Sequence, residues 1–361
     1  MKNIFRGEIK DDYVFEKTSA YIKKHNVIVD ASIGDVTLPL SPKITIAASK
    51  AAKELSFKSS MRGYPAHNGY PFLRNAIKDY YADKGIYVSD EEIFVTHGIK
   101  NDLAFFLSLL GNVTVAVSRV GYPAYKDICN LYGLNINYYD DVLSASGDII
   151  IVNSPSNPTG EVYDAKTLQR IIENATKTNS YVFFDSAYEA FCTATSSIFS
   201  VNGAKSNAIE FCSFSKTAGF TSLRCGYTVI SKKNELYDVY RRAKAVSDNG
   251  VSYVTQRMAY TALTDAKAEV KSAIRYYLRS QEIIASKLNA HVGDSPYVWV
   301  RVPDGDKAFF DLIRDYGVAV MPGSAFGDNR YIRVSAFCSY EEAEIVSKAI
   351  FAYKKIQKNF L

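Results

Sequence analysis

A single lysine stands between two serines in the segment SFSKTAGFTSLRCG, residues 213–226. Lys216 follows a predicted strand and has apolar neighbours, so burial would disfavour its ammonium form and leave an amine that can form a Schiff base. Ser213, Ser215 and Arg224 offer two hydroxyls and a guanidinium, which together suit a phosphate group. A lysine beside phosphate ligands indicates pyridoxal phosphate. Taken alone, the segment could equally be a surface loop that carries a lysine and an arginine.

Two more segments place polar side chains directly after predicted strands. Asp185 ends the strand YVFFD, where a carboxylate can pair with a pyridinium nitrogen and keep the cofactor ring protonated. In NSPSNPTG, residues 153–160, Asn157 could reach the phenolic oxygen of the cofactor, with Tyr188 as a second donor. Both segments also have ordinary interpretations, because a strand-end aspartate can cap a helix and an Asn-Pro pair can be a plain turn.

Three further features could complete such a site. The backbone N–H groups of Gly98, Ile99 and Lys100 open a predicted helix, where the positive helix end suits a phosphate. Tyr122, in GYPAY, could stack on a flat cofactor ring, although a tyrosine is more often a packing residue. Arg333 lies in the alternating strand YIRVSAF. If it faces inward it needs an anionic partner such as a substrate α-carboxylate, and if it faces outward it is an ordinary surface residue.

The elements that must position these residues indicate an α/β fold. Short apolar runs alternate with amphipathic helical segments, which is typical of a mostly parallel sheet buried by helices on both faces. From Tyr253 the pattern changes to long helices with two further strands, which predicts a smaller α+β domain. We expect residues 1–30 to form an N-terminal arm and part of the small domain. Residues 31–252 would form the large cofactor-binding domain, and residues 253–361 the small C-terminal domain. The apolar runs are 113–118, 148–153, 181–185, 209–214 and 227–230.

Composition excludes several other classes of protein. The 361 residues are 47% hydrophobic with a net charge of +5, and no apolar run approaches the roughly 18 residues that span a membrane. The charged first segment has no signal-like apolar core, so we expect a cytoplasmic protein. Five scattered cysteines without CxxC spacing argue against disulfides and a metal site, and the dispersed lysines argue against nucleic-acid binding.

The order of these motifs resembles that of the fold-type I, class I and II aminotransferases that use pyridoxal phosphate. Within them, the sequence is most similar to the L,L-diaminopimelate aminotransferase group. The resemblance covers nearly the whole chain, and its more specific parts are the GFT after the lysine, the strand PYVWV and the turn PGSAFG. It implies transfer of an amino group from an L-amino acid to a 2-oxo acid.

The resemblance also implies individual roles. Lys216 would hold the cofactor and carry a proton, and Asp185 would contact the pyridinium nitrogen. Asn157 and Tyr188 would hold the phenolic oxygen, and Tyr122 would stack on the ring. The phosphate cup would be Gly98, Ile99, Lys100, Ser213, Ser215 and Arg224. The substrate would meet Arg333 at its α-carboxylate, with Asn157, the backbone near Gly34 and Tyr13 beside it. Tyr64 and Asn249 would reach the active site of a neighbouring subunit, which implies a homodimer.

Two departures from the family pattern concern the substrate. His67 stands where the family has an acidic residue near the distal ammonium of diaminopimelate, and a histidine cannot supply that charge-assisted bond. The stretch between Gly133 and Asp148 is also shorter than in the family. We therefore expect an altered distal pocket. The alternatives are another outcome with the same cofactor, namely decarboxylation, elimination or oxidation, and a non-catalytic cofactor-binding regulator. The sequence shows no appended DNA-binding module that would support a regulator.

Overall fold

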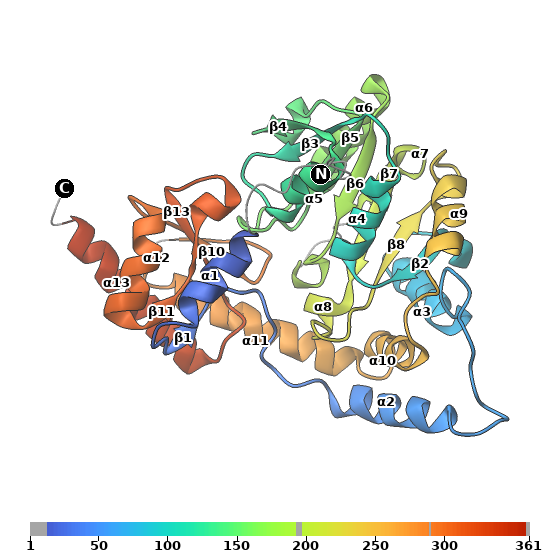
Figure 1. Cartoon of the computed structure of the whole chain (residues 1–361), viewed down its shortest axis with the longest axis horizontal. Coiled ribbons are helices and arrows are strands. Elements are labelled where there is room, and N and C mark those ends of the chain that lie inside the picture. Colours follow the sequence, from blue (N-terminus) through green and yellow to red (C-terminus); the bar gives the residue numbers. More distant parts are fainter. Residues whose placement is uncertain (1–12, 193–196, 289, 359–361) are drawn as a thin grey trace, which may run out of the picture.

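A seven-stranded sheet contains the expected apolar runs (Figure 1). The computed structural model describes residues 13–192, 197–288 and 290–358. The strand order is β2-β8-β7-β6-β5-β3-β4, and the five strands from β7 to β4 are mutually parallel. β8 runs antiparallel to both of its neighbours, β7 and β2. The strands are β2 (Ile93–Thr96), β3 (Thr114–Ser118), β4 (Asn135–Tyr139), β5 (Ile149–Asn153), β6 (Tyr181–Asp185), β7 (Ala208–Ser213) and β8 (Gly226–Ile230).

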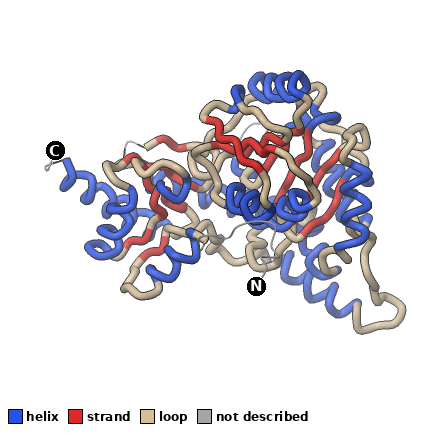
Figure 2. The backbone as a smooth tube through the Cα atoms, turned by 45° about the horizontal axis from the view of Figure 1, so that its top comes forward, coloured by secondary structure: helices blue, strands red, loops and turns tan. Residues whose placement is uncertain are grey.

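Both faces of this sheet are buried by helices, as a continuous apolar strand requires. On β6, Val182 and Phe184 pack into one core cluster with side chains of α3, α6 and α10. Phe183, between them, packs into a second cluster with side chains of α4, α5 and α9. Figure 2 shows the strands enclosed between helices. The predicted fold class, a mostly parallel sheet with helices on both faces, is confirmed.

The helices that cover the sheet include the segments expected from their amphipathic pattern. α6 begins after Asp164, whose side chain accepts from the backbone N–H of Thr167, and ends at Asn179 in the left-handed conformation. Among the described residues, no helix combines the length and the apolar composition needed to cross a membrane. The helices are α1 (Val14–Ile22), α2 (Pro42–Glu54), α3 (Pro71–Ala82), α4 (Ile99–Ser108), α5 (Ala124–Tyr132), α6 (Ala165–Thr178), α7 (Ala204–Asn207), α8 (Phe214–Thr217), α9 (Tyr237–Ser247), α10 (Tyr253–Leu263), α11 (Lys267–Ala285), α12 (Gly305–Tyr316) and α13 (Tyr340–Lys358).

A second group of elements, at the left of Figure 1, holds two small sheets and the C-terminal helices. An antiparallel sheet has the order β12-β13-β10-β9, and β1 pairs with β11 in parallel. The N-terminal segment is thereby joined to the C-terminal elements, and α11 runs between the two groups. The domain boundaries at residues 30 and 252 stay a prediction. The strands are β1 (Val29–Asp30), β9 (His291–Val292), β10 (Tyr297–Arg301), β11 (Val318–Ala319), β12 (Met321–Pro322) and β13 (Tyr331–Ser335).

Candidate active site

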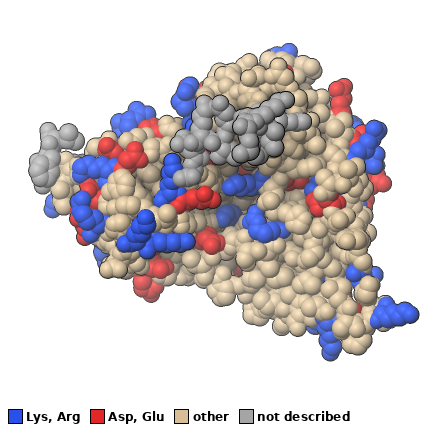
Figure 3. All heavy atoms as spheres, viewed as in Figure 1, with Lys and Arg blue, Asp and Glu red and all other residues tan. Residues whose placement is uncertain are grey.

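The carboxyl ends of three adjacent parallel strands form the floor of a cavity of about 380 Å³. Asn153 at the end of β5 pairs in register with Asp185 at the end of β6, and β7 ends beside them at Ser213. The carboxyl edge of a parallel sheet is where such folds bind ligands. In Figure 3, Lys and Arg side chains lie in the hollow between the sheet and the C-terminal group. The predicted residues that line the cavity are Gly34, Ile99, Lys100, Tyr122, Asn157, Asp185, Tyr188, Ser213, Ser215, Lys216 and Arg224.

Lys216 projects into this cavity from α8, the short helix that follows β7. Its Nζ donates a hydrogen bond to the carbonyl oxygen of Gly34 and lies 5.5 Å from the centroid of the Phe337 ring. Burial lowers the pKa of Lys216 to about 8, and the positive charges of Arg333 and Arg224 act in the same direction. At pH 8, Lys216 is therefore a neutral amine in about half of the protein molecules, and the neutral amine is the form that attacks a carbonyl.

Asp185 presents a buried carboxylate at the end of β6. Its Oδ2 accepts from the hydroxyl of Tyr125 at 2.7 Å, and its Oδ1 accepts from the backbone N–H of Ala187 at 2.9 Å. Burial raises the pKa of Asp185 to about 6, so a cationic partner would stabilise the ionised carboxylate. The next helical turn, η3 (Glu189–Phe191), has Tyr188 at its N-cap position, so Asp185 is not the cap of that turn.

The expected phosphate ligands meet at one end of the cavity. Gly98 precedes α4 with φ of 100°, and a Cβ atom there would lie 3.0 Å from Nη2 of Arg224. Glycine therefore fits both the backbone conformation and the close approach of the guanidinium. Nη1 of Arg224 donates to Oγ of Ser215 at 3.4 Å, and the Ser213 hydroxyl accepts from the backbone N–H of Ser215. A helix N-terminus, a guanidinium and two hydroxyls form a donor set for a dianionic phosphate.

Arg333 faces inward from β13 and is only 1% exposed. Its two terminal nitrogens donate to Oδ1 of Asn157 at 3.0 Å and to the carbonyl oxygen of Ser32 at 2.6 Å. Nε has no hydrogen-bond partner within the part of the chain that the structure describes. Both hydrogen-bond partners are neutral, so they do not balance the positive charge of this buried guanidinium. An anion that accepts from Nε would balance it. The interpretation of Arg333 as an outward-facing surface residue was wrong, because its side chain lies between the rings of Tyr297 and Phe326.

Tyrosines connect these groups across the cavity. The hydroxyl of Tyr188 receives a hydrogen bond from the Asn157 amide at 3.4 Å and lies 3.0 Å from the hydroxyl of Tyr297. Tyr13 donates to the hydroxyl of Tyr122 at 3.3 Å. Burial raises the pKa of Tyr188 well above its usual value, so its hydroxyl keeps its proton and remains a donor.

Six predicted residues are not part of the cavity lining. Gly98, Tyr13 and Arg333 contact residues that line it. The other three lie apart from it. Tyr64 is 84% exposed, Asn249 is also exposed, and His67 is partly buried with its ring 6.2 Å from that of Phe94. The roles expected of Tyr64 and Asn249 at a neighbouring subunit's site, and of His67 near the distal end of the substrate, stay predictions.

Four contacts at the site involve residues that the sequence did not single out. Tyr125 holds Asp185, Phe337 lies near Lys216, and Tyr297 contacts both Tyr188 and Arg333. Tyr125 could have been found, because it follows Tyr122 by three residues and so lies on a neighbouring position of the same turn. Tyr297 and Phe337 reach the site only through tertiary packing. Gly34 is required by that packing, since a Cβ there would collide with the hydroxyl of Tyr297.

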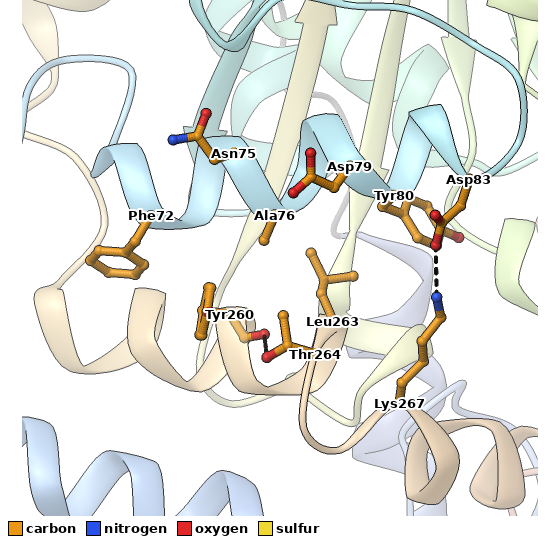
Figure 4. A pocket seen from close by; sticks show the side chains of 10 residues that line it. All are labelled: Phe72, Asn75, Ala76, Asp79, Tyr80, Asp83, Tyr260, Leu263, Thr264 and Lys267. Carbon is orange, nitrogen blue, oxygen red and sulfur yellow. Dashed lines mark hydrogen bonds and ion pairs between the residues drawn. The ribbon is translucent and has the colours of Figure 1, made fainter.

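A separate cavity of about 330 Å³ lies between α3 and α10 (Figure 4). Asp79 and Asp83 line it, and Lys267 closes one end through a 2.9 Å ion pair with Asp83. Among the described residues no group of His, Cys, Asp and Glu side chains could hold a metal ion.

The residues of the strand-end cavity fit pyridoxal phosphate. The cup around Gly98 suits a phosphate, the lysine is partly neutral near pH 8, and a buried carboxylate can meet a pyridinium nitrogen. Among the described residues, none accepts a hydrogen bond from Nε of the buried Arg333.

Comparisons with known proteins agree with this geometry. A family model described as aminotransferase class I and II matches residues 27–350. An LL-diaminopimelate aminotransferase of Lawsonia intracellularis is 34% identical, and the match covers 96% of this chain and 95% of that protein. One from Prochlorococcus marinus is also 34% identical, over 92% and 94% of the two chains. The solved structure of L,L-diaminopimelate aminotransferase from Chlamydomonas reinhardtii has a TM-score of 0.89 with 27% identity, covering 96% of this chain and 97% of that one. This chain therefore belongs to the class I and II aminotransferases, which move amino groups with pyridoxal phosphate as their cofactor.

Proposed function

We propose that this enzyme takes the amino group of an L-amino acid through Lys216 and Arg333, and passes it to a 2-oxo acid. The observation that carries the proposal is the meeting of a partly neutral lysine with a buried, incompletely paired arginine at one site. Arg333 would bind the α-carboxylate and so fix the direction of the Cα–H bond. Lys216 would then take the proton from Cα and later return a proton to the product.

The cofactor would be held by the side chains that line the strand-end cavity. When bound, pyridoxal phosphate supplies an electron sink that stabilises negative charge at the substrate Cα. Asp185 would pair with its ring nitrogen, and Asn157 with Tyr188 would donate to its phenolic oxygen. Tyr122 would cover its ring face. Its phosphate would bind Gly98, Ile99, Lys100, Ser213, Ser215 and Arg224.

The distal end of the substrate is proposed to differ from that of diaminopimelate. His67 replaces the acidic residue of the family pattern, and burial lowers its pKa, as do the charges of Arg241, Arg74 and Lys244. A neutral imidazole among cations gives no attraction to a distal ammonium group. The names of the relatives still make L,L-diaminopimelate one of the donors to be tested.

The active form is proposed to be a homodimer in the cytoplasm. Exposed apolar side chains support the dimer, because Phe57, Met61 and Tyr64 are 53%, 64% and 84% exposed within one segment before α3. Such a group of large apolar side chains is typical of an interaction surface. Tyr64 and Asn249 would reach the partner's cavity. The cytoplasm is supported by the five cysteines, none of which forms a disulfide.

The test is a donor panel given to the purified protein loaded with pyridoxal phosphate, with each L-amino acid added in turn. We expect loss of the visible cofactor band with release of one 2-oxo acid per pyridoxamine phosphate formed. Lys216→Ala should abolish turnover. Release of carbon dioxide or ammonia without pyridoxamine phosphate would instead identify decarboxylation or elimination and refute transamination. Comparing L,L-diaminopimelate with glutamate tests the distal pocket.

A further inference from the structure

A buried carboxylate lies beneath the turn that carries Asp185. Glu210, in β7, is only 1% exposed and does not line the strand-end cavity. Its Oε1 accepts from the hydroxyl of Ser186 at 2.8 Å, and its Oε2 accepts from the hydroxyls of Tyr81 at 2.8 Å and Ser197 at 2.7 Å. An ionised carboxylate can only accept hydrogen bonds, and these three hydroxyl groups all donate to it. A network of this kind is costly to bury, so its location calls for a reason.

Some side chains of the turn line the cavity, and others bond to side chains outside it. Asp185 and Tyr188 line the cavity, whereas Ser186 and Glu189 bond away from it. The backbone N–H of Ser186 also donates to the carbonyl oxygen of Phe211 at 2.9 Å, which fixes the turn to β7. Asp185 and Ser186 are joined by one peptide bond, so a rotation of the turn that moves the Ser186 hydroxyl also moves the Asp185 carboxylate.

A second carboxylate holds the other end of the same turn. Glu189 accepts from the hydroxyl of Tyr80 at 2.6 Å and forms an ion pair with Lys84. Tyr80 and Tyr81 are consecutive residues of α3, so one helix binds both carboxylates through adjacent hydroxyls. The turn is thus held at Ser186, directly after Asp185, and at Glu189, directly after Tyr188.

We propose that Glu210 is a positioning residue of the cofactor site, which acts through Ser186 to hold the Asp185 carboxylate in the direction of the ring nitrogen. The proposal rests on the proposed role of Asp185. Without the bond to Glu210, the turn can rotate while Asp185 keeps its chemical identity, and a misdirected carboxylate pairs poorly with a cation. Neither Glu210 nor Ser186 touches the cofactor in this arrangement.

Two serines offer a matched test, because each donates one hydrogen bond to the same carboxylate. Ser186→Ala removes the donor that belongs to the turn, and Ser197→Ala removes a donor from elsewhere in the chain. Ser197 and Ser186 are 2% and 3% exposed, so the two changes are alike in burial. Ser197 also accepts from the backbone N–H of Phe199, so its loss should reduce thermal stability at least as much.

We expect Ser186→Ala to weaken pyridoxal phosphate binding about tenfold, as for loss of one charge-assisted contact, and to shift the pH midpoint of the visible cofactor band. Ser197→Ala should leave the cofactor affinity within about twofold of wild type and the pH midpoint unchanged. Titration of the cofactor-free protein with pyridoxal phosphate measures the affinity, and differential scanning fluorimetry measures stability. Equal changes in affinity for the two variants, or none for Ser186→Ala, would overturn the proposal.

A double-mutant cycle distinguishes action through Asp185 from a general loosening. In an Asp185→Asn background, Ser186→Ala should have no further effect on cofactor affinity, whereas additive effects would contradict the proposed route. Glu210→Gln should reproduce the Ser186→Ala change in affinity, and the serine pair decides the matter if Glu210→Gln does not fold. Failure of the wild-type protein to bind pyridoxal phosphate would reject the proposed function itself, a result separate from normal binding that Ser186→Ala leaves unchanged.

Discussion

At the scale of single residues, the chemistry of this site depends on how burial changes two ordinary side chains. Burial lowers the pKa of Lys216 to about 8 and raises the pKa of Asp185 to about 6. Both shifts have the same origin, since removing water disfavours the charged form of either group. The lysine thereby gains nucleophilic character, and the carboxylate gains the most from a cationic partner.

The lowered pKa of Lys216 predicts the pH dependence of its reaction with pyridoxal phosphate. We expect the rate of covalent attachment to the cofactor-free protein to rise with pH and to level off above a midpoint near 8. Borohydride reduction at timed intervals, followed by mass spectrometry of the Lys216 peptide, measures that rate. Peptides that carry an exposed lysine such as Lys50 are the control for non-specific labelling.

The same shift has a defined sign for stability. The folded pKa of Lys216 lies below its ordinary value of 10.5, so between pH 8 and pH 10.5 the unfolded chain binds more protons. The unfolding free energy of the cofactor-free wild type, relative to Lys216→Met, should therefore increase across this interval. A constant or falling difference would show that the lysine is not buried as described.

Arg333 predicts a separation between substrate and cofactor binding. Arg333→Lys keeps the charge but loses the forked donor geometry, so KM for the amino donor should rise about tenfold to a hundredfold. Cofactor affinity should stay within about twofold. Arg330→Lys is the control, because Arg330 is 70% exposed and paired with Asp328, and it should leave KM unchanged. Equal effects of the two variants on KM would remove Arg333 from the substrate site.

At the scale of elements, a buried ion cluster ties α4 to the segment that follows α9. Nζ of Lys244 lies 3.3 Å from Asp102 in α4 and 2.5 Å from Asp248, and the side chain of Lys244 is 4% exposed. Asp102 also accepts hydrogen bonds from Tyr240 and Thr228. Hydrogen bonding from His97, with the charge of Lys244, holds the pKa of Asp248 well below its usual range. The cluster connects the helix that opens the phosphate cup to the turn that presents Asn249.

Removal of the cation from this cluster should be far more damaging than removal of a surface cation. Lys244→Met leaves the buried carboxylate of Asp102 and the partly buried carboxylate of Asp248 without their ammonium, and we expect a loss of about 3 to 5 kcal/mol in the free energy of unfolding. Lys287→Met is the control. Lys287 pairs with Glu344 where both side chains are 44% exposed, and its loss should cost less than about 1 kcal/mol. Urea unfolding measures both, and similar losses would contradict the burial argument.

At the scale of the whole molecule, the site combines residues from both groups of elements. Arg333 and Ser32 belong with the small sheets, and they meet Asn157 at the edge of the large sheet. Lys216 likewise bonds to Gly34, on the segment that leads from β1 to α2. Relative movement of the two groups would therefore change the distance between the proposed carboxylate clamp and the lysine.

Complementation between inactive subunits tests the proposed dimer. A dimer of one Lys216→Ala chain and one Tyr64→Ala chain contains one site with both residues intact, if Tyr64 reaches the partner. Random reassociation of equal amounts should therefore restore about a quarter of the wild-type activity. The pair Lys216→Ala and Arg333→Ala is the control, because both residues belong to one chain and no intact site can form. Restoration by the control, or none by the first pair, would refute a shared site.

Much of the fold could be predicted because its patterns are local and strong. The strand 181–185 has the predicted bounds, since its continuous apolar run is distinct from the segments around it. The strands β2 and β4 were not predicted. β2 has only four residues, and β4 is an edge strand whose residues are mostly exposed, so neither carries a distinct apolar pattern.

The sequence alone determined the mostly parallel sheet, the cofactor class and the identities of most predicted residues that line the cavity. Strand ends and motifs can be recognised from short stretches of sequence. Tertiary structure decided which partners those residues meet. Tyr125 holds Asp185, Tyr297 and Phe326 enclose Arg333, and Glu210 lies beneath Ser186. These contacts join residues as far apart in the sequence as Tyr125 and Asp185, which are separated by 60 positions, and Ser186 and Glu210, which are separated by 24. Contacts between residues so far apart in the sequence depend on how helices and strands pack together, and no local sequence pattern predicts that packing.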